Sequence, residues 1–145
     1  MSEQLQLEQW LCFQIEDETY AHPVSQVREI LDYLTPVPVP GAQFCVEGVL
    51  NIRGEIVTIV SSKHLLGLDD ASRHSEHIIV LETSVGLVGI SVDEVEKINL
   101  LNYDDMVPAE RNHALSPVKG TLNHHQQLLI LTDFERCLNE LEEYE

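Results

Sequence analysis

Seven histidines are the residues of this chain best suited to bind a metal ion or to act as general bases. Their spacing supports neither role. His74 and His77 flank a polar stretch, His124 and His125 are adjacent in a predicted turn, and neither pair belongs to an H-E-x-x-H pattern. We therefore expect no metal site. A β-barrel that uses its histidines to bind a metal or a small molecule is retained as the alternative from a different functional class.

The other groups with catalytic potential also lack a supporting pattern. Cys12, Cys45 and Cys137 form no C-x-x-C pair, and their odd number cannot be fully paired within the chain, which favours a reducing compartment. Cys12 lies in an apolar run and is expected to be buried. Glycine-rich phosphate-binding motifs and the G-x-S-x-G nucleophile motif do not occur in the sequence. The sequence therefore predicts neither an enzyme nor a bound cofactor.

The charge balance limits the kind of partner. The chain has 145 residues, about one domain by length, with 8 basic and 25 acidic residues and a net charge of −17. This charge repels phosphate backbones and anionic lipid surfaces, and together with 6% aromatic residues it disfavours a nucleic-acid-binding barrel. No apolar run reaches 18 residues and residues 1–8 are polar, so we expect a cytoplasmic protein.

Arg53 is the basic residue with the clearest potential for recognition. It lies with Gly54 in a predicted tight turn. There its guanidinium group could bind a partner's carboxylate through two parallel hydrogen bonds or form an ion pair with one of the chain's own acidic residues. The stretch from Val27 to Ile30 mixes apolar and charged residues and fits either a recognition stripe or a half-buried strand. The sequence leaves both choices open.

The second half of the chain repeats the first. At an offset of 68 residues, apolar positions such as Val24 and Ile30 match Val92 and Ile98, and Val39 and Pro40 match Val107 and Pro108. After a short insertion the offset becomes 72, which aligns Gly48 with Gly120 and Asn51 with Asn123. The chain is therefore two copies of one unit.

Each copy contains two predicted β-hairpins, because short apolar runs flank polar or glycine-containing turns. A further extended segment between them, ending near prolines, gives five strands per copy. The hairpins are residues 10–15 with 19–24, 46–52 with 55–60, 77–82 with 87–92, and 118–122 with 128–131, and the extended segments are 27–31 and 95–100.

Short, regularly spaced strands predict an all-β fold of two small five-stranded barrels, since closure removes exposed sheet edges. We expect one domain, 1–145, made of subdomains at about 8–70 and 75–145 with termini that can cross over. Helix is limited to a single turn that Ser62 caps and that stops at Gly67, and to a short C-terminal helix. The C-terminal helix is capped by Thr132 or Asp133 and carries an apolar stripe of Phe134, Cys137, Leu138 and Leu141.

Several segments resemble, in order and spacing, the CheW family of bacterial chemotaxis coupling proteins. The most specific is the G-V-x-N-x-R-G turn formed by Gly48 to Gly54. The similarity covers nearly the whole chain, and its other segments are Phe13–Ala21, Val24–Leu31, Leu87–Val95, Lys119–Leu122 and Leu128–Leu131.

This resemblance implies two SH3-like barrels around a shared core and a non-enzymatic adaptor, without a cofactor, between chemoreceptors and a CheA-type histidine kinase. The implied partners are the kinase's regulatory domain and the cytoplasmic tips of methyl-accepting chemoreceptors, at arrays on the inner face of the membrane. The residues that match family contact positions are Val27, Glu29, Gly48, Asn51 and Arg53, to which Ile30 and Gly54 are added as neighbours.

One segment departs from the family pattern. Thr58 to Lys63 stands where the family usually has P-V-I-D-L-R, so that Ser61 replaces the usual aspartate, while the repeat places Asp133 at the equivalent position. With the charge of −17, this difference suggests a dedicated pathway, such as control of type IV pili, as the alternative to flagellar chemotaxis.

Overall fold

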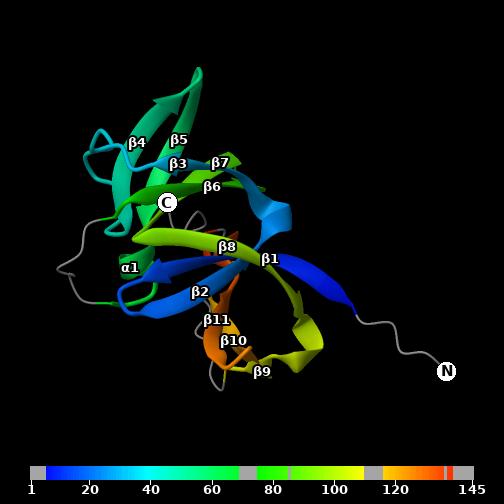
Figure 1. Ribbon diagram of the computed structural model, residues 1–145. Coiled ribbons are helices and arrows are strands. Elements are labelled where there is room, and N and C mark those ends of the chain that lie inside the picture. Colours follow the sequence, from blue (N-terminus) through cyan, green and yellow to red (C-terminus); the bar gives the residue numbers. More distant parts are fainter. Residues whose placement is uncertain (1–5, 69–74, 85, 110–115, 136, 139–145) are drawn as a thin grey trace.

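A computed structural model describes residues 6–68, 75–84, 86–109, 116–135, 137 and 138 (Figure 1). The predicted all-β class, with two barrel-like sheets, a shared core and a short C-terminal helix, is confirmed. The predicted five strands hold for one sheet only, because the two-residue strand Val107–Pro108 gives the other sheet six. The strands are β1 Leu7–Ile15, β2 Glu18–Pro23, β3 Val27–Asp32, β4 Val46–Ile52, β5 Glu55–Ser61, β6 His77–Thr83, β7 Gly86–Val92, β8 Glu94–Asn102, β9 Val107–Pro108, β10 Val118–His124 and β11 Gln127–Thr132. The helix α1 is Ser62–Leu65, and 3₁₀ turns lie at Val24–Gln26 and Tyr103–Asp105.

The two halves exchange hairpins. One sheet has the order β8-β1-β2-β11-β10-β9 and the other β3-β6-β7-β5-β4. The N-terminal hairpin β1–β2 thus joins the strands of the second half, and β6–β7 joins those of the first half (Figure 1). The contiguous ranges 8–70 and 75–145 therefore do not coincide with the two sheets, and the crossing-over involves a hairpin from each half.

Strand registers match the internal repeat. β11 pairs in parallel with β2 and β5 with β7, and the pairs Ile130↔Tyr20 and Thr58↔Val88 are equivalent in the two copies. One alignment was wrong. Val37, and not Val39, is the counterpart of Val107, because Val37 pairs with Val49 as Val107 pairs with Thr121.

Two local details differ from the sequence prediction. The β10–β11 turn has only two residues, His125 and Gln126, because both adopt positive φ angles, which close a two-residue hairpin with the twist of the strands. The cap of α1 is Ser61 and not Ser62: the Ser61 hydroxyl accepts a hydrogen bond from the His64 backbone N–H at 3.4 Å.

The central strands are buried on both faces, so their alternating side chains supply different cores. On β1, Trp10 and Cys12 face the interior of the six-stranded barrel, whereas Leu11 and Phe13 face the shared core between the sheets. On β6, Ile78 and Val80 face the other barrel interior, whereas Ile79 and Leu81 face the shared core.

The C-terminal helix closes the shared core. Residues 134, 135, 137 and 138 are helical, and the side chains of Phe134, Cys137 and Leu138 are buried, as the predicted stripe requires. Leu141, the fourth predicted member of the stripe, lies outside the described residues.

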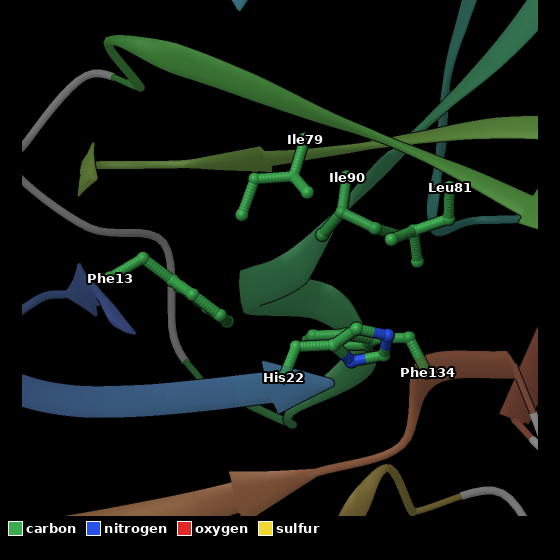
Figure 2. Close-up of a pocket in the computed structure, with 6 residues that line it drawn as sticks. All are labelled: Phe13, His22, Ile79, Leu81, Ile90 and Phe134. Carbon is green, nitrogen blue, oxygen red and sulfur yellow. The ribbon is translucent and has the colours of Figure 1, made fainter. Parts of the chain in front are cut away.

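His22 is the buried polar residue of this core. Its ring stacks on Phe134 at 5.4 Å between centroids, and Figure 2 shows it among the apolar side chains of both sheets. Nε2 donates to Gln26 Oε1 at 2.7 Å, and Nδ1 lies 3.4 Å from Thr132 Oγ1. Burial lowers the pKa of His22 to about 4, although the hydrogen bond to Gln26 and the charge of Asp133 act in the opposite direction.

Gly48 and Gly120 lie at equivalent positions of the repeat, and at each of them a second backbone segment passes very close. A Cβ atom on Gly48 would lie 2.3 Å from the Val37 carbonyl oxygen, and one on Gly120 would lie 2.3 Å from that of Val107. Gly48 also has a φ of +151°. Only glycine allows these contacts.

We predict that Gly120→Ala lowers the free energy of unfolding by about 2 kcal/mol or more and the Tm by roughly 5 °C, because the carbonyl of Val107 must move. Gly48→Ala costs more, since backbone strain is added. The matched control is Gly41→Ala, at a φ of +80° with open space around it, which costs only about 1 kcal/mol. Thermal denaturation that ranked Gly41→Ala as the most damaging variant would contradict this account.

We also predict a stability loss in mild acid that is specific to His22. Because its folded pKa of about 4 lies below that of the unfolded chain, the unfolded state takes up the proton first, and stability falls as pH drops below about 6.5. Between pH 7 and pH 5 the free energy of unfolding should fall by about 2 kcal/mol more in the natural protein than in His22→Gln. Denaturant titrations of the two proteins at both pH values measure this difference. The carboxylates are the same in both proteins, so their contributions cancel. Equal losses in the two proteins would show that the fold does not hold His22 neutral.

Candidate functional site

Several predicted site residues meet where β3 approaches the tip of the β4–β5 hairpin, which we call the first edge. The Arg53 guanidinium forms an ion pair with the carboxylate of Glu29, so residues 24 positions apart in the sequence are in contact. Arg28 lies 3.5 Å from Glu55 and 3.4 Å from Glu82. Ion pairs therefore connect β3 to the hairpin tip, to β5 and to β6.

The turn itself presents Arg53. Ile52 pairs with Glu55, so the loop consists of Arg53 and Gly54, whose φ angles are 51° and 86°. The Gly54 backbone N–H donates to Asn51 Oδ1 at 2.9 Å. The Asn51 side chain thus fixes the turn, and the Arg53 side chain remains 70% exposed.

The other predicted residues have different environments. Ile30 is 41% exposed on β3. Val27 is partly buried and packs against the shared core, because a β-bulge between Val27 and Glu29 shifts the alternation of β3. Gly48 is buried beneath Val37. The surface of the first edge is therefore made by Glu29, Ile30, Asn51, Arg53 and Gly54, while Val27 and Gly48 support it from below.

Sequence reasoning missed part of this surface. Glu55 and Glu82 come from distant strands, and only the fold shows that they flank Arg28. Ile56 is 64% exposed and pairs with Asn51 across the β4–β5 ladder. The available signal for Ile56 was its place as an apolar residue two positions after the turn that contains Arg53.

The chemistry of the first edge suits recognition of charged groups. Exposed ion pairs contribute only about 0–1 kcal/mol to stability, since water and salt weaken them. A carboxylate or ammonium group on another protein can therefore replace an internal partner at small cost. The apolar side chains beside the charges add area that a partner can bury.

The histidine-based alternative gains no support from the described residues. Among them, no group of three or more histidine, cysteine, aspartate or glutamate residues is arranged to hold a metal ion. His77 lies 3.8 Å from Asp32, and His74 is outside the described residues. The gap beside His22 does not admit a water-sized sphere (Figure 2). None of the described helices has the length and apolar character needed to cross a membrane.

Comparisons with known proteins identify the family. The model of the CheW-like domain matches residues 9–142. The chemotaxis protein CheW of Thermotoga maritima is 27% identical over 139 residues, which cover 90% of this chain and 87% of that protein. The protein of the same name from Rhizobium meliloti is 30% identical over 99 residues, which cover 68% of this chain and 64% of that protein.

A solved structure supports the same assignment at the level of the fold. The scaffolding protein TtCheW of Thermoanaerobacter tengcongensis superposes with a TM-score of 0.78 at 19% identity, covering 88% of this chain and 90% of that one. The two barrel-like sheets are thus the paired SH3-like barrels of that fold. Since the family match spans nearly the whole sequence, this chain belongs to the CheW-like family and is a non-enzymatic adaptor of chemotaxis signalling.

Proposed function

We propose that this adaptor couples the cytoplasmic tips of methyl-accepting chemoreceptors to the regulatory domain of a CheA-type histidine kinase, in arrays at the inner face of the membrane. The observation that carries the proposal is the CheW-like match over residues 9–142. An adaptor needs rigid surfaces rather than a reactive centre, and two sheets that share one core provide them.

The receptor tip docks at the first edge. Arg53 is placed to bind a carboxylate of the receptor, and Glu29 is placed to bind a cationic group or to orient Arg53. Ile30 buries apolar area, while Asn51 and Gly54 fix the turn that carries Arg53. Val27 and Gly48 act indirectly, by holding β3 and β4 in place.

High affinity is not required for this role. A dissociation constant near 1 μM corresponds to about −8 kcal/mol, which a small surface with a few good contacts can supply. Repeated contacts in an array then raise the overall avidity without any new contact. We expect the kinase's regulatory domain to bind at one or both barrel ends.

Co-sedimentation tests the coupling role directly. The adaptor is mixed with the kinase regulatory domain and with a receptor signalling fragment from the same organism, singly and together. We expect the adaptor to bind each of them and to increase the amount of kinase domain recovered with the receptor fragment. Binding to neither component would exclude the proposal.

We predict that Arg53→Ala and Glu29→Ala weaken binding to the receptor fragment about tenfold, because each removes one charge-assisted contact. Both variants should keep a Tm within about 2 °C of the natural protein, since an exposed ion pair contributes little to stability. Isothermal titration calorimetry and thermal denaturation give the two quantities.

The matched control is Lys119→Gln, which removes one positive charge from the six-stranded barrel, where Lys119 lies over the Tyr103 ring. It should bind the receptor fragment like the natural protein. If Arg53→Ala or Glu29→Ala unfolds, the ion pair is structural and the docking site is not at the first edge. If Lys119→Gln weakens binding as much as Arg53→Ala, the effect of Arg53→Ala comes from net charge alone.

A further inference from the structure

The internal repeat gives the molecule a second edge, equivalent to the first. It comprises the tip of the β10–β11 hairpin, at the opposite end of the molecule from the β4–β5 tip (Figure 1), and Lys97 of β8, whose charge acts on His124 at that tip. At the offsets of the repeat, Lys97 takes the place of Glu29, and His125 takes the place of Arg53. A basic residue of the second edge, Lys97, therefore stands at the position of the acidic Glu29 in the first edge.

The second edge lacks the internal neutralisation of the first. In the first edge Arg28 and Arg53 each have a carboxylate partner. At the second edge, no ion pair with a carboxylate joins Lys97, His124 or His125 among the residues that the structure describes. The position of Arg28 is held by Glu96, which accepts a hydrogen bond from the uncharged Gln14 side chain at 2.7 Å.

His124 and His125 are close together beside Lys97. Their ring centroids are 4.1 Å apart, with an interplanar angle of 59°. The pKa of His124 is lowered by burial, by the neighbouring His125 and by the charge of Lys97. Two of these causes, His125 and Lys97, act through positive charge, in a chain whose net charge is −17.

The turn holds these side chains at an energetic cost. His125 and Gln126 have φ angles of 50° and 68°, a region in which a residue other than glycine costs of order 1 kcal/mol. The first edge has glycine at the second of these positions, Gly54. Non-glycine residues in strained turns are concentrated at functional sites, which favours a role for the side chains at this tip.

We propose that Lys97, His124 and His125 form a docking site for the carboxylate side chains of a short acidic peptide segment on a partner protein. Charge complementarity selects this occupant: the ammonium group and the imidazole N–H groups donate to carboxylate oxygens, and a bound carboxylate supplies the negative charge that the first edge provides internally. The proposal does not depend on receptor docking at the first edge.

Nuclear magnetic resonance tests the proposal on the full-length chain at pH 6.5 and low salt, with a capped hexaglutamate peptide as the probe. We expect chemical-shift changes centred on Lys97, His124 and His125, with saturable binding. Lys97→Gln and His125→Gln should each weaken binding about tenfold, since each removes one charge-assisted contact. Both residues are exposed, so the spectra of the variants should remain those of the folded protein.

The control Lys119→Gln carries the same charge change as Lys97→Gln and should bind the peptide like the natural protein. A parallel titration with inorganic phosphate distinguishes the ligand class. Phosphate that binds as tightly as the peptide at the same residues would overturn the assignment to carboxylate segments. Shifts spread over the whole surface, or shifts that survive in both variants, would overturn the site itself.

Discussion

The structure depends on the reciprocal exchange of the β1–β2 and β6–β7 hairpins between its two sheets. The exchange places these strands between a barrel interior and the shared core, so the middle residues of β1 and β6, Trp10 to Phe13 and Ile78 to Leu81, are apolar on both faces. It also creates the two parallel pairings, β2 with β11 and β5 with β7, through which each half is hydrogen-bonded to the other. Neither half can therefore complete a sheet alone, and the relative position of the two edges is fixed by the core and not by a linker.

Equivalent polar contacts hold each exchanged hairpin at its turn. Lys63, which is in α1, lies 2.9 Å from Asp93 and 3.5 Å from Glu16 in the β1–β2 turn. At the equivalent position after β11, the Glu135 carboxylate accepts a hydrogen bond from the Ser84 backbone N–H in the β6–β7 turn at 3.2 Å. Each helix that follows a barrel strand thus contacts the hairpin of the other sheet. Lys63 and Asp93 are largely buried, so removal of either partner would leave a buried charge; their pairing specifies one docking angle between the sheets.

The sequence was sufficient to predict the strands, the repeat and the all-β class, because alternation of apolar residues and turn chemistry are local. It was not sufficient to predict the exchange of hairpins. Leu11 and Cys12 would be buried and apolar in either sheet, so their residue types do not indicate which sheet the hairpin joins. The partner of Arg53 remained open for a similar reason: Glu29 is one of 25 acidic residues, and only strand placement brings it into contact. The role of Gly48 was likewise hidden, because the contact that requires glycine comes from the backbone of Val37.

The two copies keep their backbone and differ in surface charge, for a physical reason. Gly48 and Gly120, the equivalent bulges before them and the parallel registers constrain main-chain geometry, and these features are the same in both halves. Side chains on the outer faces carry no such constraint. The Tyr33 hydroxyl donates to Glu47 at 2.6 Å, whereas at the equivalent place Lys119 lies 4.9 Å from the centre of the Tyr103 ring. The duplicated aromatic ring is kept while the charge beside it is inverted. A duplicated scaffold can therefore present two edges of the same shape and of different charge, which allows one small adaptor to distinguish two partners by electrostatics alone.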